Sequence, residues 1–189
     1  MHAFWISLGV IFVAELGDKS QLMALAFATR FKAWPVLIGI TLATGFVHAV
    51  SVLVGAVLGA NIPTRAVAVV AGLAFFGFAA WTLRGDKLNE DEEAKATKTT
   101  RNAIIAASVA FFLAELGDKT MLATITLATT EGAVGTWAGS TVGMVVADAM
   151  AIVVGKQLGT RLPEKAIRIG ATVAFVVFGT ILLIQGIRG

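Results

Sequence analysis

The sequence predicts an all-α integral membrane protein whose six transmembrane helices form two inverted three-helix repeats. Three observations predict this fold class. The mean hydropathy is +0.85, with 57% hydrophobic and 14% charged residues, whereas soluble domains carry about a quarter charged residues. Apolar stretches of membrane-spanning length recur, and one acidic motif occurs twice. Basic residues lie between the apolar stretches rather than along one face, so we expect a lipid bilayer and no nucleic acid as partner.

Six apolar segments are long enough to cross the hydrocarbon layer. They span residues 3–29, 34–60, 66–83, 103–129, 134–158 and 166–187. The first lacks a basic leader and a small-residue cleavage pattern, so we expect it to be retained as a span. Residues 85–101 form the one long polar segment, which is typical of a solvated linker.

The sequence repeats itself at a constant offset of 100 residues. FVAELGDKSQL matches FLAELGDKTML, and VGAVLGANIP matches VGKQLGTRLP. Roughly a third of the aligned positions are identical. We therefore expect a first repeat at 1–84, a linker at 85–101 and a second repeat at 102–189. Each repeat crosses the membrane an odd number of times, so the second is predicted to be inverted.

The distribution of basic residues predicts the orientation in the membrane. Loops after the first, third and fifth spans hold about eleven Lys and Arg residues, and the opposite side holds about two. The linker is therefore expected in the cytosol and both termini outside. The chain contains no cysteine, which excludes disulfides, thiolate metal sites and cysteine nucleophiles.

The repeated motif places ionisable side chains in the middle of the first and fourth spans. Its acids are Glu15 and Asp18 in the first copy, and Glu115 and Asp118 in the second. A charge at the bilayer centre costs a few kcal/mol, so such residues face a bundle interior or an aqueous cavity. Acids three positions apart are expected on one helix face, and inverted repeats would bring the four carboxylates together. Gly17 and Gly117 either allow close backbone approach or break the helix, which would free carbonyl oxygens as ligands.

Four buried carboxylates require positive charge nearby. Lys19 and Lys119 supply part of it, and the remaining deficit of two is balanced by one divalent cation or by two protons. This balance suggests an exchange cycle. The donors are all oxygens, which favours Ca²⁺ and Mn²⁺ over Zn²⁺ or Cu⁺, and Mg²⁺ is disfavoured because it loses water reluctantly. Neutral oxygens nearby belong to Ser20, Gln21 and Thr120. The alternative, a structural Glu–Lys pair in each motif, would leave one Asp unneutralised per repeat.

The repeats carry different ionisable residues at one intramembrane position, where His48 in the second span aligns with Asp148 in the fifth. Asp148 is interpreted either as an accessory ligand or proton acceptor, and His48 as a proton relay. The alternative is that both are polar residues hydrogen-bonded to a neighbouring helix.

Glycine and phenylalanine patterns predict how the helices pack. Glycines spaced four residues apart indicate close helix contacts; they are Gly55 and Gly59, Gly155 and Gly159, and Gly135, Gly139 and Gly143. The Phe-rich third and sixth spans have no ionisable residue at their centres. We expect them to face lipid or the second subunit of a homodimer.

ELGDKS and ELGDKT fit the pattern E-x-G-D-(K/R)-(S/T). Two copies at the starts of two three-span halves resemble the small cation/proton exchanger family of bacterial manganese exporters and Golgi manganese/calcium exchangers. The resemblance covers essentially the whole chain. It implies a secondary transporter that exports Mn²⁺, with Ca²⁺ as a second cargo, against protons and without a prosthetic group. With no N-terminal extension of the eukaryotic organelle kind, the chain is expected in a bacterial inner membrane.

The resemblance also implies a set of site residues. The metal ligands would be Glu15, Asp18, Glu115 and Asp118, with Ser20 and Thr120 as supporting positions. Gln21 matches the glutamine that often follows the motif in this family, but Met121 does not. The second half is therefore expected to coordinate the ion differently.

Two other function classes are compatible with an acidic intramembrane site. An intramembrane metal-dependent enzyme would use the same carboxylates, but the sequence has no H-E-x-x-H motif and no nucleophile elbow, so no enzyme is expected. A passive cation channel would need no proton gradient. The inverted repeat and the glycine-interrupted motifs favour alternating access over a continuous pore.

Overall fold

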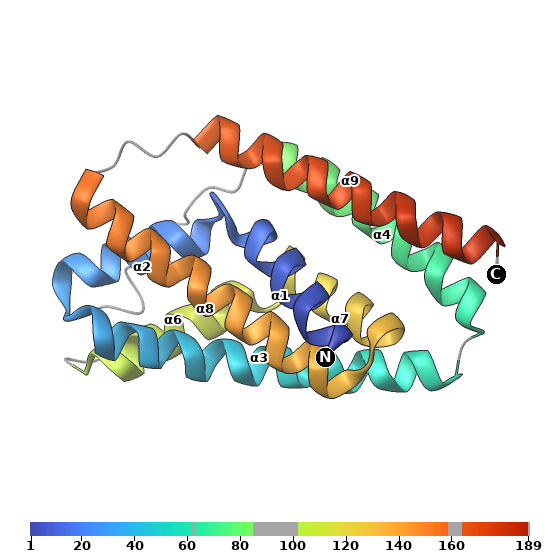
Figure 1. Cartoon of the computed structure of the whole chain (residues 1–189). Helices are drawn as coiled ribbons and strands as arrows, with labels where there is room; N and C mark the ends of the chain where they lie inside the picture. The colour runs from blue at the N-terminus through green and yellow to red at the C-terminus, as the bar shows by residue number, and fades with distance from the viewer. Residues whose placement is uncertain (62, 85–101, 159–163, 189) are drawn as a thin grey trace.

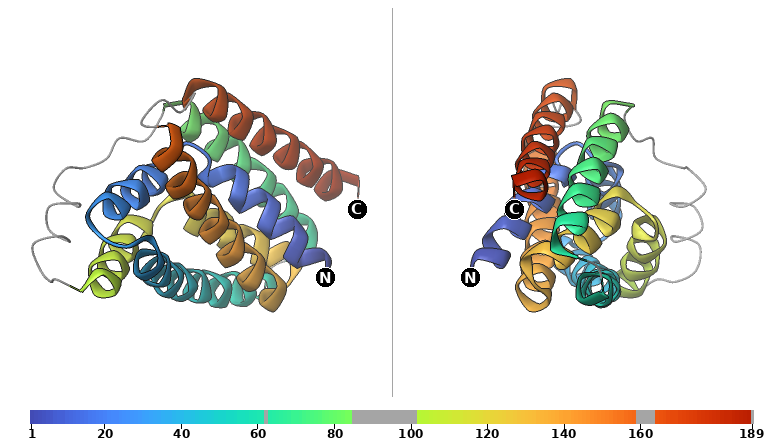
Figure 2. Two further views of the ribbon diagram at one scale, coloured as in Figure 1. Left: turned by 60° about the vertical axis from the view of Figure 1, so that its left-hand side comes forward. Right: turned by 90° about the vertical axis from the view of Figure 1, so that its right-hand side faces the viewer.

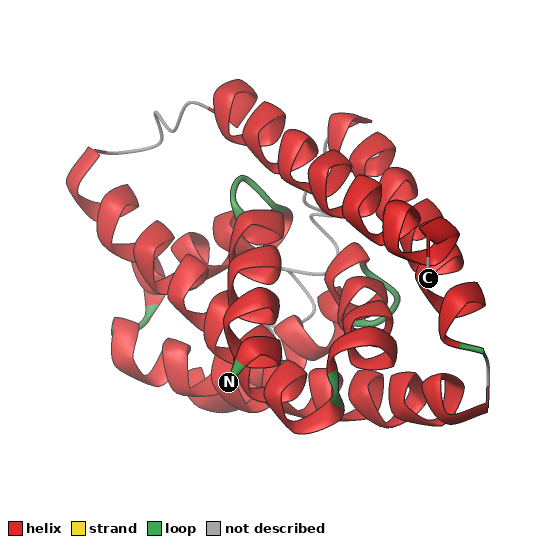
Figure 3. Cartoon of the chain, turned by 45° about the vertical axis from the view of Figure 1, so that its right-hand side comes forward, coloured by secondary structure: helices red, strands yellow, loops and turns green. Residues whose placement is uncertain are grey.

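A computed structural model describes residues 1–61, 63–84, 102–158 and 164–188, and these residues are helical almost throughout, with short turns (Figures 1 and 3). The helices are α1 (His2–Glu15), α2 (Lys19–Arg30), α3 (Ala33–Asn61), α4 (Thr64–Arg84), α6 (Ala103–Glu115), α7 (Lys119–Glu131), α8 (Ala133–Leu158) and α9 (Glu164–Arg188). The predicted linker at 85–101 lies outside the described residues. Two short helices followed by two long ones occur in each half.

Four helices in the described ranges are long and apolar enough to cross a membrane, namely α3, α4, α8 and α9. They match the predicted spans at 34–60, 66–83, 134–158 and 166–187 to within a few residues. Their outward faces are apolar: Leu53 is 68% exposed and Val70 is 65% exposed. Exposed apolar surface on this scale is typical of contact with lipid.

The predicted spans at 3–29 and 103–129 are each divided into two half-helices at the motif, so of the two interpretations of Gly17 and Gly117 the helix break is confirmed. α1 ends at Glu15 and α2 begins at Lys19. Between them Leu16 has φ −63° and ψ 117°, Gly17 has φ 75°, and the Asp18 N–H donates to the Glu15 carbonyl at 3.1 Å. This is a type II β-turn, whose third residue needs a positive φ and is therefore glycine.

The second motif contains the same turn. Leu116 has φ −64° and ψ 114°, Gly117 has φ 77°, and the Asp118 N–H donates to the Glu115 carbonyl at 3.2 Å. Each acidic pair is thus presented by a turn between two half-helices. The expectation that the two acids share one helix face is wrong for the same reason.

The two halves of the chain interlock through glycine contacts. α3 runs parallel to α6 and α7, and α8 runs parallel to α1. The contacts that show this are Gly39 with Ala107, Gly55 with Ala128, Gly135 with Ala3, and Gly143 with Leu8. A side chain at Gly39 or Gly139 would collide with the neighbouring backbone. The predicted close packing is confirmed at five of the seven glycines, Gly55, Gly59, Gly135, Gly139 and Gly143. At Gly155 it stays a prediction, and Gly159 lies outside the described residues.

α4 and α9 pack against each other in antiparallel directions along one side of the bundle (Figures 1 and 2). Gly72 meets Gly179, and the ring centroids of Phe75 and Phe178 lie 4.9 Å apart. Phe75 and Phe175 are buried. These rings therefore pack between α4 and α9, while the outer faces of both helices are apolar and exposed, as at Val70 and Val173. The prediction that these two spans face lipid or a second subunit stays a prediction. A homodimer stays a prediction.

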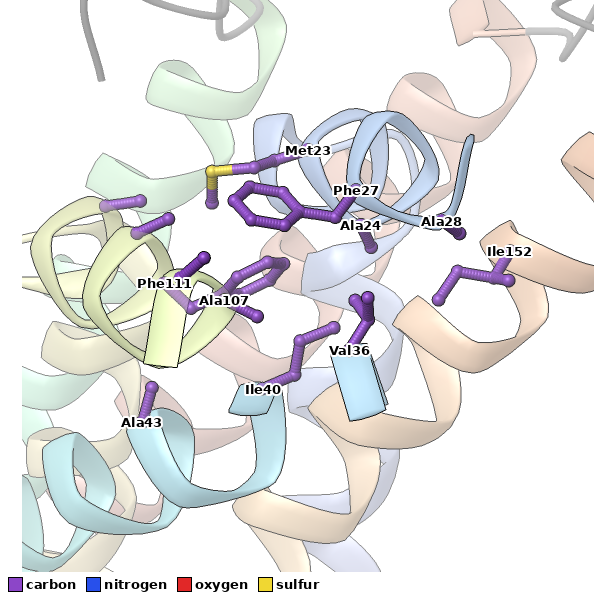
Figure 4. Packing of buried hydrophobic residues seen from close by; sticks show 13 residues of the cluster. Met23, Ala24, Phe27, Ala28, Val36, Ile40, Ala43, Ala107, Phe111 and Ile152 are labelled. Carbon is purple, nitrogen blue, oxygen red and sulfur yellow. The ribbon is translucent and has the colours of Figure 1, made fainter. Parts of the chain in front are cut away.

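Two apolar clusters hold the motif turns in place. One joins α2, α3, α6 and α8, and Figure 4 shows Phe27 of α2 close to Phe111 of α6. The other joins α1, α4, α7, α8 and α9. Ala14 belongs to the second cluster and Ala114 to the first. Because each directly precedes a motif glutamate, both turns are anchored in the core.

Candidate metal site

The motif acids are buried at the breaks between half-helices. Glu15 and Glu115 are 0% exposed, and Asp18 and Asp118 are at most 4% exposed. Each glutamate ends a helix and accepts a hydrogen bond from the hydroxyl that follows the motif lysine. The Ser20 hydroxyl donates to Glu15, and the Thr120 hydroxyl donates to Glu115 Oε2 at 2.8 Å. The predicted supporting hydroxyls therefore position the glutamates.

The two motifs are joined by ion pairs that cross between the repeats. Lys119 Nζ pairs with Asp18 Oδ1, and Lys19 Nζ lies 3.3 Å from Asp118 Oδ1. Sequence reasoning missed this pairing, because spacing along one chain segment does not show which groups the fold places opposite each other. The pairs bring both turns into one site.

The carboxylates of both motifs also interact electrostatically. Glu15 interacts with Asp18 and Asp118, and Glu115 interacts with Glu15 and both aspartates. The lysines pair with the aspartates, whereas Glu15 Oε1 and Glu115 Oε1 are buried without a hydrogen-bond partner among the described residues. A buried, unpaired carboxylate oxygen is costly unless a cation or proton accompanies it.

The described residues contain no group of three or more acidic, His or Cys side chains already arranged to hold a metal ion. The assignment of all four motif acids as metal ligands therefore stays a prediction. Four helix ends meet the two motif turns. α2 and α7 begin there with the positive ends of their helix dipoles, and α1 and α6 end there. Broken helices of this kind can present free backbone groups to a transported ion.

The position after each motif differs between the repeats. Gln21 Oε1 accepts from the Gly17 N–H at 2.8 Å, and its Nε2 donates to the Ala147 carbonyl of α8 at 3.0 Å. In the second repeat the Gly117 N–H lies 3.2 Å from Met121 Sδ. Gln21 therefore ties the first turn to α8, and the other turn has no equivalent amide at this position.

His48 and Asp148 are both 0% exposed, and none of their side-chain nitrogen or oxygen atoms has a hydrogen-bond partner within the described ranges. Ser20 of α2 does interact with Asp148, so both interpretations of Asp148 and of His48 stay predictions. Asp148 lies within interaction range of Glu15 and Ser20. Nothing comparable connects His48 to a motif acid in the described residues.

The family described as divalent cation/proton antiporter GDT1 matches residues 3–90 and 103–189. The chain belongs to the GDT1 family. The family is one of transmembrane cation transporters and is not an enzyme class, in agreement with the sequence prediction. The GDT1 match spans both halves of the chain, and each matched segment contains one motif turn.

Individual relatives cover most of this chain. It is 34% identical over 171 residues to a Vibrio cholerae protein whose name proposes that it is a manganese exporter, covering 89% of this chain and 84% of the relative. It is 32% identical to the GDT1-like protein sll0615 of Synechocystis, covering 96% of each. It is 31% identical to protein PAM71 of Arabidopsis thaliana chloroplasts, but spans only 55% of that protein. No solved structure matches the chain.

Proposed function

We propose that this chain is a secondary transporter that exports Mn²⁺ from the cytosol in exchange for protons, with Ca²⁺ as a competing cargo. One observation carries the proposal. Two buried acidic turns from opposite halves are cross-linked by Lys–Asp pairs, and each retains a glutamate with a buried, unpaired oxygen. Such glutamates need a cation or a proton, and exchange between the two is what the GDT1 family does.

Charge balance supports the exchange. The four motif acids carry four negative charges when ionised, and Lys19 and Lys119 carry two positive charges. One divalent cation or two protons would neutralise the remainder equally well. Both loaded forms then cross the low-dielectric layer with little net charge. Oxygen donors favour Mn²⁺ and Ca²⁺ among the divalent ions.

We further propose six membrane crossings in two inverted repeats, at 1–84 and 102–189, with each broken pair of half-helices counted as one crossing. Three packing directions support this topology: α1 runs parallel to α8, α3 runs parallel to α6 and α7, and α4 is antiparallel to α9. The excess of basic residues in alternate loops then favours both termini outside and the linker at 85–101 in the cytosol. A bacterial inner membrane location is supported by the bacterial relatives.

The test is Mn²⁺ flux in proteoliposomes with and without an imposed pH gradient. Wild-type flux should saturate and follow the gradient. Glu15→Gln and Asp118→Asn should each reduce exchange by about 100-fold, because each removes a buried charge that balances the bound cation. Glu131→Gln is the matched control, since Glu131 ends α7 and pairs with the exposed His2; it should transport normally.

Two results would contradict the proposal. Flux that ignores the pH gradient would indicate a passive channel. Normal exchange by both Glu15→Gln and Asp118→Asn would show that the motif acids do not bind the cargo.

A further inference from the structure

Asp148 lies at the first motif turn because of how α8 packs. Gly143 of α8 lies against Leu8 and Phe12 of α1. One helical turn further on, the Ala147 carbonyl accepts a hydrogen bond from Gln21 at 3.0 Å. Asp148 follows directly and lies within interaction range of Glu15 and Ser20.

Asp148 and Glu15 both carry buried acceptor oxygens that no donor in the described residues reaches at normal hydrogen-bond geometry. Both carboxylate oxygens of Asp148 and Oε1 of Glu15 are buried and have no hydrogen-bond partner among the described residues. The motif lysines form their ion pairs with Asp18 and Asp118, and Lys119 also interacts electrostatically with Glu15. Two neighbouring buried carboxylates with no cation between them are strongly unfavourable, and their oxygens together with a hydroxyl make a donor set suited to a hard divalent ion.

The second half offers a weaker donor set at the equivalent place. His48 replaces Asp148, and Met121 replaces Gln21. Thr120 still donates to Glu115, so the difference is confined to the flanking positions. A cation site shared equally by the two motifs would be expected to have the same number of carboxylates on each side.

We infer that Asp148 is a fifth carboxylate of the cation site, and that the divalent ion binds on the first-motif side, between α1, α2 and α8. Glu15 and Asp148 supply its carboxylate oxygens and Ser20 its hydroxyl. This assignment rests on the proposed function and adds where within the site the ion is held. With Asp148 included, five ionised carboxylates and two lysines leave a deficit of three, so one carboxyl group of the site keeps a proton when the divalent ion is bound.

The test compares equivalent substitutions in the two halves, Asp148→Asn and His48→Asn. Mn²⁺ binding is measured on purified full-length protein by calorimetry and by Mn²⁺-dependent thermal stabilisation, and the KM for Mn²⁺ is measured in proteoliposomes. Asp148→Asn should raise both Kd and KM by about tenfold or more, because affinity depends on the number of charged ligands. His48→Asn should change them by less than about threefold.

A second pair keeps the inference testable if Asp148→Asn does not fold. Ser20→Ala and Thr120→Ala remove the same hydroxyl from each motif. Ser20→Ala should weaken Mn²⁺ binding by about fivefold, the effect of one lost polar contact, and Thr120→Ala should weaken it less.

Equal effects within each pair, or wild-type Mn²⁺ binding by Asp148→Asn, would overturn the inference. If Asp148→Asn binds normally while Glu15→Gln abolishes exchange, the inference fails and the proposed function stands. If Glu15→Gln also exchanges normally, the proposed function itself fails.

Discussion

The first and second motif turns share their backbone and differ in what surrounds them. Both are type II turns with glycine at a positive φ, and both hold a glutamate by the hydroxyl two residues after the Asp. The first turn is tied to α8 through Gln21 and lies beside Asp148. At the corresponding positions the second turn has Met121 and His48.

This comparison distinguishes the residues that form the backbone of the site from the residues that determine which donors a cation meets. The duplicated residues determine the two turns and the crossed Lys–Asp pairs, because these features are the same in both halves. The unequal residues lie outside the motif, where they change the donors available to a cation without changing the backbone. The two turns therefore have the same backbone geometry but different side chains around them.

Among the predicted changes, substitutions in the crossed ion pairs should show the largest difference between the two motifs. The Lys119 and Asp18 side chains are 3% and 0% exposed, whereas those of Lys19 and Asp118 are 19% and 2% exposed. Lys119→Met should destabilise the protein by about 3–5 kcal/mol, because it leaves a buried carboxylate without its partner. Lys19→Met should cost less, since its ammonium retains contact with water. Thermal unfolding in detergent measures both losses.

The double variant Asp18→Asn/Lys119→Met is the control for this prediction. It removes both charges of the more buried pair, so much of the lost stability should return. If Lys119→Met unfolds at the wild-type temperature, the pair does not hold the two motifs together.

Much of the fold was predictable because hydrophobic length is a strong signal. The predicted spans at 34–60, 66–83, 134–158 and 166–187 match α3, α4, α8 and α9 closely. A helix break at Gly17 and Gly117 was one of two interpretations of the sequence, and the apolar residues on both sides of each motif did not decide between a break and a close backbone approach. Gly17 and Gly117 were the available signal, but a glycine in an apolar stretch is equally typical of close helix packing.

The candidate site was predictable in composition but not in pairing. The duplicated ELGDK sequence was enough to identify one Glu and one Asp in each motif as intramembrane acids. The crossed pairs of Lys119 with Asp18 and Lys19 with Asp118 depend on the packing of two segments about 100 residues apart. The sequence shows Asp148 only as a difference between the repeats, because its proximity to Glu15 depends on the path of α8 along α1.

The shared turn can be tested with two glycines that differ only in backbone conformation. A Cβ added at Gly117 or at Gly77 would meet no atom within 4 Å, but Gly117 has φ 77° whereas Gly77 is helical. Gly117→Ala should destabilise the protein by about 1–3 kcal/mol through backbone strain. Gly77→Ala should be neutral or stabilising by up to about 1 kcal/mol, because alanine favours the helix.

Gly117→Asn sharpens this comparison, because asparagine tolerates a positive φ better than alanine does. It should recover part of the stability that Gly117→Ala loses. Equal unfolding temperatures for Gly117→Ala and Gly77→Ala would show that the turn is not under this conformational constraint.

The smallest expected effect concerns the hydrogen bonds of Gln21, which connect the first turn to α8. Gln21→Met makes the first motif resemble the second, since Met121 occupies the equivalent position. The substitution removes the amide contacts to the Gly17 N–H and the Ala147 carbonyl, so it should cost about 1–2 kcal/mol of stability. Met121→Gln is the reciprocal change and should cost less, because it removes only a weak sulfur acceptor.

Because Gln21 holds α8 where Asp148 adjoins Glu15, Gln21→Met should also weaken Mn²⁺ binding by a few-fold. Unchanged binding would show that α8 is positioned without the Gln21 hydrogen bonds.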